Sequence, residues 1–398
     1  MGVPAAPPAP PAPADAAPAG GPGAEDSGGR ALHHVTEQTR TYPCKSCGGQ
    51  LEFDIATQKL KCPDCGGVQD IVEAAGRTVD EQDFRTALAA LKANAAVTGP
   101  QLTGQKEVVC QSCGGHTTFT GTLTSTRCPY CATPIQRDDV QDAPSRLAID
   151  GVVPFAVDAR QAKESLEAWI NGRWFAPSEF KKYNRTGSFA SVYAAYFTYD
   201  AATATRYEGQ RGDDYTVTVG SGDNQHTETR TRWYGVSGMV NDSFDDLCVL
   251  ANDGLDRSKV VALEPWPTGA AKPFSAEFVA GHLCRTYDHD VEECFPEAHE
   301  RMDKEIERTI ERDIGGDHQR ISRQDTSFQS LTFKHLLLPI WLLTVIYAGK
   351  PFQVFINGVT GEVQGERPWS KVKIAAATVV AVILIAVIAA LYLKSRRS

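Results

Sequence analysis

Two cysteine-rich units constrain this chain more than any other feature. Residues 42–69 and 108–135 both follow the pattern C-x2-C-x14-C-x2-C, and the second unit is displaced by 66 positions from the first. Such an internal repeat predicts two copies of one small structural unit. Leu51, Phe53 and Ile55 alternate as in a strand, which predicts a hairpin between the cysteine pairs. A unit of about 28 residues has too small a core to fold alone, so it needs a cross-link.

The cysteine pairs predict two zinc sites. The candidate ligands of the first site are Cys44, Cys47, Cys62 and Cys65, and those of the second are Cys110, Cys113, Cys128 and Cys131. Zinc prefers four thiolates in a tetrahedron at about 2.3 Å, and four cysteines leave no open position for water. We therefore expect structural sites. Redox-active C-x-x-C pairs or iron–sulfur clusters are alternatives, but the recurrence of both pairs at one spacing favours zinc.

An apolar stretch near the end of the chain predicts a transmembrane helix. Residues 374–393 contain no charged side chain; Lys373 precedes them, and residues 394–398 form a short basic tail. Twenty helical residues span about 30 Å, the thickness of the hydrocarbon core of a bilayer. A buried core helix is the alternative, but such a helix usually carries a polar stripe. One C-terminal membrane helix is therefore expected.

The beginning of the chain and its overall charge bear on compartment and partners. Residues 1–39 are rich in Pro, Ala and Gly and lack the apolar core of a signal peptide, so we expect a disordered tail and a cytosolic N-terminal body. The formal net charge is −9. An acidic balance does not favour the phosphate backbone of nucleic acid as a partner.

The remaining pattern predicts an α+β fold. We expect two small zinc ribbons followed by a mainly antiparallel β domain with helices, and then one C-terminal transmembrane helix. The expected order is a zinc ribbon at 40–70, a helical spacer at 71–105, a second ribbon at 106–137, an α+β body at 148–370 and the membrane helix at 374–393.

Within the body, apolar spacing predicts two helices. Asp158 is placed to cap the first, and the second is expected from near Pro296 to Ile314. The residues expected to face inward are Ala162, Leu166, Trp169 and Ile170 in the first helix, and Ala298, Met302, Ile306 and Ile310 in the second.

Alternating apolar and aromatic runs predict antiparallel strands in the body. The predicted strands cover 191–200, 203–209, 214–219, runs between 231 and 251, and a β-meander over 330–370. Leu336–Ile346 is apolar enough to suggest a second membrane segment. Its short length and Pro339 favour a central buried strand instead.

The ribbons carry little net charge. Residues 40–70 hold four basic and four acidic side chains, and residues 106–136 hold two basic and one acidic. There is no basic stripe, so protein docking is favoured over binding of nucleic acid. No catalytic motif is present in the sequence, and we identify no catalytic residue.

Three further cysteines lie outside the repeat. Histidines lie near two of them in the sequence. The residues considered as possible metal ligands are Cys248, Cys284, Cys294, His282, His289 and His299. Their spacing fits no ligand pattern, so we interpret the cysteines as buried residues. A third possible function is an enzyme with a pocket near the polar loop 220–229. The sequence shows no set of titratable groups that would converge there.

Several motifs beyond the ribbons carry a family resemblance. They are VVPFAVD at 152–158, NGRWFAPSEF at 171–180, VSGMVNDSFDDLCVLA at 236–251, ALEPW at 262–266 and the segment 332–370. With the two ribbons, they resemble bacterial double-zinc-ribbon, single-pass membrane proteins of the transcription-factor-B type. Those proteins are associated with flotillin-like (SPFH, virion-core) and phage-shock membrane-stress proteins, and are sometimes labelled primosomal helicase-like.

The resemblance implies a non-enzymatic, tail-anchored scaffold in a bacterial plasma membrane. Its cytosolic ribbons would recruit a soluble flotillin-like protein, and its body would pair with a second membrane subunit. The alternative is a membrane-tethered nucleic-acid-binding or replication- and transcription-associated zinc-ribbon factor. That alternative predicts binding that weakens steeply with salt.

Overall fold

The computed structural model describes most of the chain after the N-terminal tail. The described residues are 37–38, 42–71, 77–94, 105–109, 116–120, 122–127, 134–137, 147–172, 187–222, 225–347, 350–366 and 370–395. Val35–Ser398 forms one compact unit. Apart from β1 (Glu37–Gln38), the tail predicted over 1–39 lies outside these residues.

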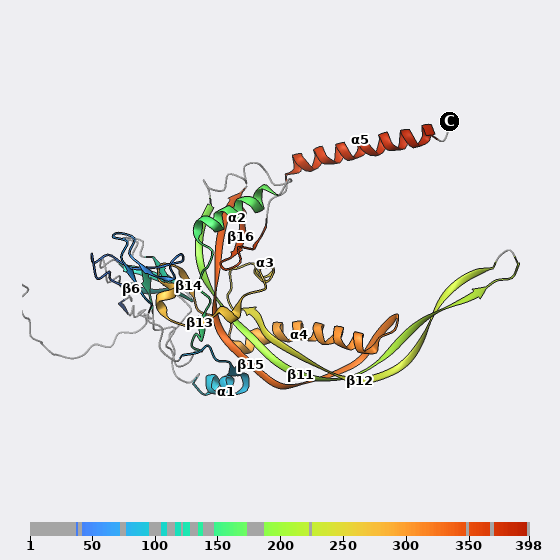
Figure 1. Cartoon of the computed structure of the whole chain (residues 1–398), viewed down its shortest axis with the longest axis horizontal. Helices are drawn as coiled ribbons and strands as arrows, with labels where there is room; N and C mark the ends of the chain where they lie inside the picture. Colours follow the sequence, from blue (N-terminus) through green and yellow to red (C-terminus); the bar gives the residue numbers. More distant parts are fainter. Residues whose placement is uncertain are drawn as a thin grey trace, which may run out of the picture. The chain divides into compact units, whose positions relative to one another are not determined.

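Three very long strands dominate the fold. β11 (Gly187–Val219) lies between β12 (His226–Leu250) and β15 (His318–Tyr347) and is antiparallel to both (Figure 1). The sequence predicted antiparallel strands over these residues, and that prediction is confirmed. Its division of them into short separate strands was wrong, because each strand is continuous. The register of β11 on β12 shifts between Tyr199 and Ala201, where Asp246 of β12 has a φ of +50°, but neither strand ends there. We call the outer parts of these strands the arm; it consists of 202–219 of β11, 226–243 of β12 and 318–330 of β15.

The large sheet continues on both sides of β11 and β15. In spatial order it contains β13 (Lys272–Pro273), β10 (Gly151–Val152), β15, β11, β14 (Leu283–Arg285), β8 (Leu123–Arg127) and β9 (Pro134–Gln136). In addition, β16 (Lys350–Asn357) pairs with β15, and β17 (Val363–Gly365) pairs with β16. The β10–β15 and β11–β14 pairs are parallel. The predicted α+β class, with a large and mainly antiparallel sheet, is confirmed in this mixed form.

The apolar segment Leu336–Ile346 is a central strand. Its residues pair with β11 on one side, and from Ile340 onward they also pair with β16 on the other. Leu336, Leu337 and Leu338 are fully buried. The prediction of a central buried strand is confirmed.

The first predicted helix is α2 (Ala159–Asn171). Asp158 caps it by accepting hydrogen bonds from the backbone N–H groups of Arg160 and Gln161. Three of its predicted inward residues are buried, namely Ala162, Leu166 and Ile170, while Trp169 is half-buried. This helix prediction is confirmed.

The second predicted helix, α4 (Val291–Ile314), begins earlier than expected. Asp290 caps it, and Val291 in its first turn is buried, so the helix includes Pro296 rather than beginning near it. The expected apolar stripe is confirmed, because Ala298, Met302, Ile306 and Ile310 are all fully buried. Figure 1 shows α4 lying along the curved arm.

Short elements complete the described structure. They are β2 (Glu52–Asp54), β3 (Lys59–Lys61), β4 (Val68–Gln69), β5 (Gln82–Asp83), α1 (Phe84–Asn94), β6 (Gln105–Val109), β7 (His116–Thr120), α3 (Arg257–Val261) and the 3-10 helices η3 (Thr268–Ala270) and η4 (Ala276–Val279). Helix α1 lies in the predicted helical spacer. Its Phe84 is buried against Phe295 and Phe333.

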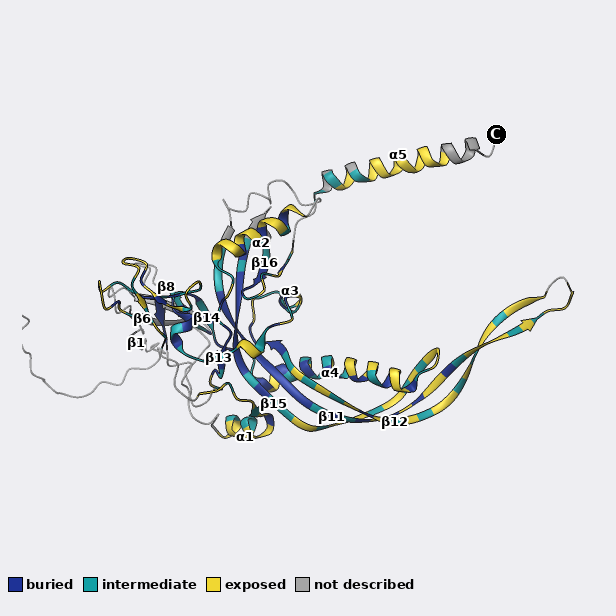
Figure 2. Ribbon diagram, viewed as in Figure 1, coloured by how far each residue is buried: buried dark blue, intermediate teal, exposed yellow. Residues whose placement is uncertain are grey.

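The apolar stretch 374–393 lies in a helix, α5 (Lys371–Ser395). Figure 2 shows its described side chains as mainly exposed. The side chains of Ala376 and of residues 390–393 lie outside the described part. Within the part of the chain that is described, no helix combines the length and the apolar character that crossing a membrane requires.

Candidate metal centre

The first ribbon is a three-stranded sheet that carries two matching cysteine turns. Strand β3 pairs with both β2 and β4. In one turn the N–H of Gly48 donates to the carbonyl of Cys44 at 2.9 Å, and in the other Gly66 donates to Cys62 at the same distance. Both glycines have a positive φ, +75° and +73°, a backbone conformation that residues with a side chain rarely adopt. The C-x2-C-G-G sequence therefore specifies each turn locally.

The four cysteines of this ribbon meet at one point. Their sulfur atoms all lie within 4.8 Å of one another. The Sγ atoms of Cys44 and Cys65 are 3.7 Å apart, and those of Cys47 and Cys62 are 3.6 Å apart. A tetrahedron with zinc–sulfur bonds of about 2.3 Å has edges of about 3.8 Å. The cluster is therefore compatible with zinc.

The backbone around the cluster favours thiolates. The N–H groups of Ser46 and Cys47 lower the pKa of the Cys44 thiol to about 6. The N–H of Gly49, 3.4 Å from the Sγ of Cys47, acts in the same direction, but the neighbouring thiols of Cys65 and Cys62 raise the pKa of Cys47 to about 12. When zinc is bound, it cross-links the two turns through four thiolates. A closed set of four cysteines suits a structural role and offers no position for substrate.

The second predicted site is not described. Cys110, Cys113, Cys128 and Cys131 all lie outside the described residues. The strands between and beside them are described, and β8 pairs with β9 in an antiparallel hairpin. Val108, Phe119 and Ile135 are fully buried together in a small cluster of their own. A second zinc site therefore stays a prediction.

The first ribbon is attached to the body by side chains. Phe53 of β2 is buried, and its ring packs edge-on against Phe278 at 5.6 Å and against His282 at 6.0 Å. The N–H of Phe53 donates to the carbonyl of Ala280, and the side chain of Gln58 donates to the carbonyl of Phe155 at 2.8 Å. The hairpin that carries the cysteines is thus inserted into the main core.

The second ribbon is attached by backbone pairing. Strand β8 extends the large sheet by pairing with β14, where Ser125 lies opposite Cys284. The N–H of Thr286 donates to the carbonyl of Thr122 at 2.9 Å. The side chain of Gln136 in β9 donates to the carbonyl of Ala276 at 2.9 Å. This hairpin is therefore a part of the sheet.

Two contacts join the ribbons to each other. The guanidinium of Arg127, from the second ribbon, forms an ion pair through two nitrogens with the carboxylate of Glu52, from the first. The hydroxyl of Tyr42 donates to the side-chain oxygen of Gln136 at 3.3 Å. The two ribbons therefore present one joint surface.

An acidic cluster that sequence reasoning missed lies at the base of the arm. Asp200, Asp245 and Asp246 place carboxylate oxygens within 4.8 Å of one another. Burial raises the pKa of Asp200 to about 6. The Nζ of Lys334 lies 2.6 Å from Asp246 and 3.7 Å from Asp200. Because Lys334 already supplies a cation, we interpret this group as a partly buried ion network. No sequence spacing signals it, since the long strands bring its members together.

The remaining cysteines are buried, as the sequence interpretation predicted. Cys248, Cys284 and Cys294 are free thiols within the core. The histidines near them have separate partners. His282 Nδ1 lies 2.7 Å from the hydroxyl of Ser191, and His289 and His299 pair with Asp253 and Asp303 respectively.

Comparison with known proteins shows a distant relationship. No protein-family model matches the chain, and no solved structure gives a significant match. A relative in sequence is named uncharacterized protein YdjG, from Bacillus subtilis (strain 168). It is 25% identical over 345 residues, which are 84% of this chain and 92% of the relative. This chain is therefore a distant homologue of YdjG.

Proposed function

We propose that the protein is a non-enzymatic, membrane-anchored scaffold whose ribbons recruit a soluble protein. The partner that the family resemblance suggests is a cytosolic flotillin-like (SPFH) protein of a bacterial membrane-stress system. In this proposal the apolar stretch 374–393, part of whose side chains lie outside the described residues, crosses the bacterial plasma membrane. The body faces the cytosol, and a second membrane subunit pairs with the body. Zinc stabilises the ribbons and takes no part in chemistry.

The observation that carries the proposal is the two-sided character of the first ribbon. One side is held in the core through Phe53. On the other side, the cysteine turns expose Lys45, Ser46 and Gly66 to solvent, and the apolar Val68 is 51% exposed. The first ribbon thus presents an exposed apolar side chain, of the kind that the core of a protein interface buries, on a support that is held in the main core.

The test is recruitment by the full-length protein in native membranes. The tagged chain is crosslinked, captured and its partners identified by mass spectrometry. We expect a flotillin-like protein as the main partner, about tenfold reduced capture for Val68→Asp, and unchanged zinc content in that variant. The matched control is Tyr234→Asp, which removes an aromatic side chain that is 46% exposed on the arm. It should recruit normally.

Loss of the metal sites gives a second test. Cys44→Ser should lower the zinc content and abolish recruitment while the protein stays in the membrane fraction. Recruitment that survives in Cys44→Ser, in Cys128→Ser and in the double variant contradicts the docking role. Capture of replication or transcription proteins, or of nuclease-sensitive nucleic acid, supports the alternative nucleic-acid function instead.

A further inference from the structure

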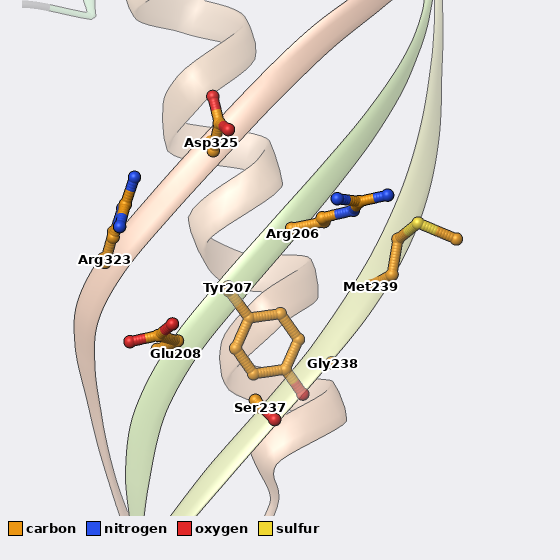
Figure 3. A pocket seen from close by; sticks show the side chains of 8 residues that line it. All are labelled: Arg206, Tyr207, Glu208, Ser237, Gly238, Met239, Arg323 and Asp325. Carbon is orange, nitrogen blue, oxygen red and sulfur yellow. The ribbon is translucent and has the colours of Figure 1, made fainter.

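One face of the arm is open and carries a regular pattern of charge. We call it the outer face; it displays Arg206, Glu208, Ser237, Met239, Arg323 and Asp325 around a shallow hollow of about 460 Å³ (Figure 3). All six side chains except those of Ser237 and Met239 are charged at neutral pH. Met239 is 58% exposed although it is apolar.

Helix α4 covers the opposite face of the arm. Tyr207, Val240 and Ile321 pack there against α4, and the hydroxyl of Tyr207 donates to the carboxylate of Asp313 in α4 at 2.5 Å. Because side chains alternate along a strand, Arg206 and Glu208 on either side of Tyr207 point away from α4. Both are exposed.

The charges on the outer face alternate along and across the strands. In the register of the sheet, Arg206 lies opposite Asp325, and Glu208 lies opposite Arg323. Each cation therefore has an anion beside it on its own strand and another on the neighbouring strand. Within the described part of the chain, no ion pair joins these four groups. Figure 3 shows Arg206 turned toward Met239 and away from Asp325.

This pattern is complementary to itself. We infer that the outer face of the arm binds the outer face of a second copy of this chain. If the twofold axis runs parallel to the strands between β11 and β15, Arg206 faces the Asp325 of the second copy and Glu208 faces its Arg323. If the axis runs across the strands, Arg206 faces Glu208 and Arg323 faces Asp325. In both arrangements every charge meets its opposite.

The outer face is large enough for a small interface. Three strands about 4.8 Å apart, followed over about ten residues, cover about 14 Å by 35 Å, or about 500 Å². With the axis across the strands, two copies would then bury about 1,000 Å², the lower limit for a specific interface. With the axis parallel to the strands only β11 and β15 overlap, and about 700 Å² is buried. Neighbouring positions of this face carry small residues, including Ala204 and Gly235, and a Cβ at Gly235 would meet nothing within 4 Å. A second sheet can therefore approach closely.

The test uses two differently tagged full-length copies that are expressed together. The inverted variant carries Arg206→Glu, Glu208→Arg, Arg323→Asp and Asp325→Arg, so its pattern matches itself but opposes the wild type. We expect wild type to recover wild type and inverted to recover inverted. The mixed pair should show at least about tenfold lower recovery, because like charges then face each other. Recovery of the matched pairs should also fall with added salt.

A half-inverted variant distinguishes the two arrangements. With only Arg206→Glu and Glu208→Arg, an axis parallel to the strands places like charges opposite each other and self-recovery is lost. An axis across the strands keeps opposite charges together and self-recovery is retained. The control exchanges an exposed pair on α4, Glu305→Arg with Arg308→Glu, and should pair normally with wild type.

Two results would overturn the inference. The first is a wild-type chain that does not recover a second wild-type copy. The second is a mixed pair of wild type and inverted variant that forms as well as the matched pairs. The zinc content and membrane fraction of each variant, which should equal those of the wild type, show that the substitutions leave the fold intact.

Discussion

The two ribbon units share one sequence pattern but are attached to the body in different ways. The first is held by an aromatic side chain, Phe53, which enters the main core. The second is held by a strand, β8, which hydrogen-bonds to β14 as a member of the large sheet. The repeat therefore predicts what the units are, and not how they are fixed.

The difference has a physical consequence for the role of zinc. Phe53 is in place only if the hairpin that carries it keeps its shape. A zinc ion bound by the four cysteines would cross-link the two turns that flank this hairpin. Strand β8 is positioned instead by backbone hydrogen bonds to the body, which do not depend on its cysteines. The first ribbon should therefore couple metal binding to the stability of the body more strongly than the second.

The largest expected effect comes from removing the anchor. Phe53→Ala leaves a cavity beside Phe278 and His282, so we expect the free energy of unfolding of the body to fall by about 3–5 kcal/mol. Urea denaturation of the full-length protein, followed by tryptophan fluorescence, measures it. The matched change in the second ribbon is Phe119→Ala, which acts on the separate cluster with Val108 and Ile135. If Phe119→Ala destabilises the body equally, the proposed contrast between the ribbons is wrong.

The second effect is a pH dependence at the site where Phe53 enters the core. His282 is buried between Phe53 and Phe155, and desolvation, with a contribution from the charge of Arg127, lowers its pKa from 6.5 to about 4. In the unfolded chain His282 binds a proton at a higher pH than in the folded chain. The free energy of unfolding that depends on neutral His282 is therefore fully present above pH 6.5. It is lost as the pH falls from about 6.5 to about 4.

This pKa difference corresponds to about 3 kcal/mol. The measurement compares the pH dependence of unfolding for wild type and His282→Gln, because any loss of bound zinc in acid affects both proteins alike. Burial also raises the pKa of Asp150 to about 6, which has the opposite effect on stability and is common to both proteins. Parallel curves for the two proteins between pH 7 and pH 4 would contradict the role of His282.

The smallest effect concerns the ion pair between the ribbons. Arg127 and Glu52 are 46% and 24% exposed, so solvent screens their attraction. A double-mutant cycle with Arg127→Ala and Glu52→Ala should give a coupling energy of about 0.2–1 kcal/mol, falling with salt. A coupling energy of several kcal/mol would show that this ion pair, and not Phe53, is the main attachment of the first ribbon.

Several features could be predicted from the sequence because they depend on neighbouring residues. The C-x2-C-G-G turns need only their own cysteines and glycines, and the cap of α2 needs only Asp158 and the first turn that follows. The buried stripe of α4 follows from helical periodicity. The first residue of α4 could not be located in this way, because the cap at Asp290 and the burial of Val291 outweigh the preference of Pro296 for a first turn.

Other features were decided only by the tertiary structure. The contact of Phe53 with Phe278 and the ion pair of Lys334 with Asp200 both join residues far apart in the chain. The length of β11 likewise depends on its pairing with distant strands. Local periodicity shows which face of an element seeks burial, but not which other face will cover it. The sequence by itself therefore determined the ribbon turns, the helices and the presence of strands. Long-range packing decided how the two ribbons join the sheet and which face of the arm remains open.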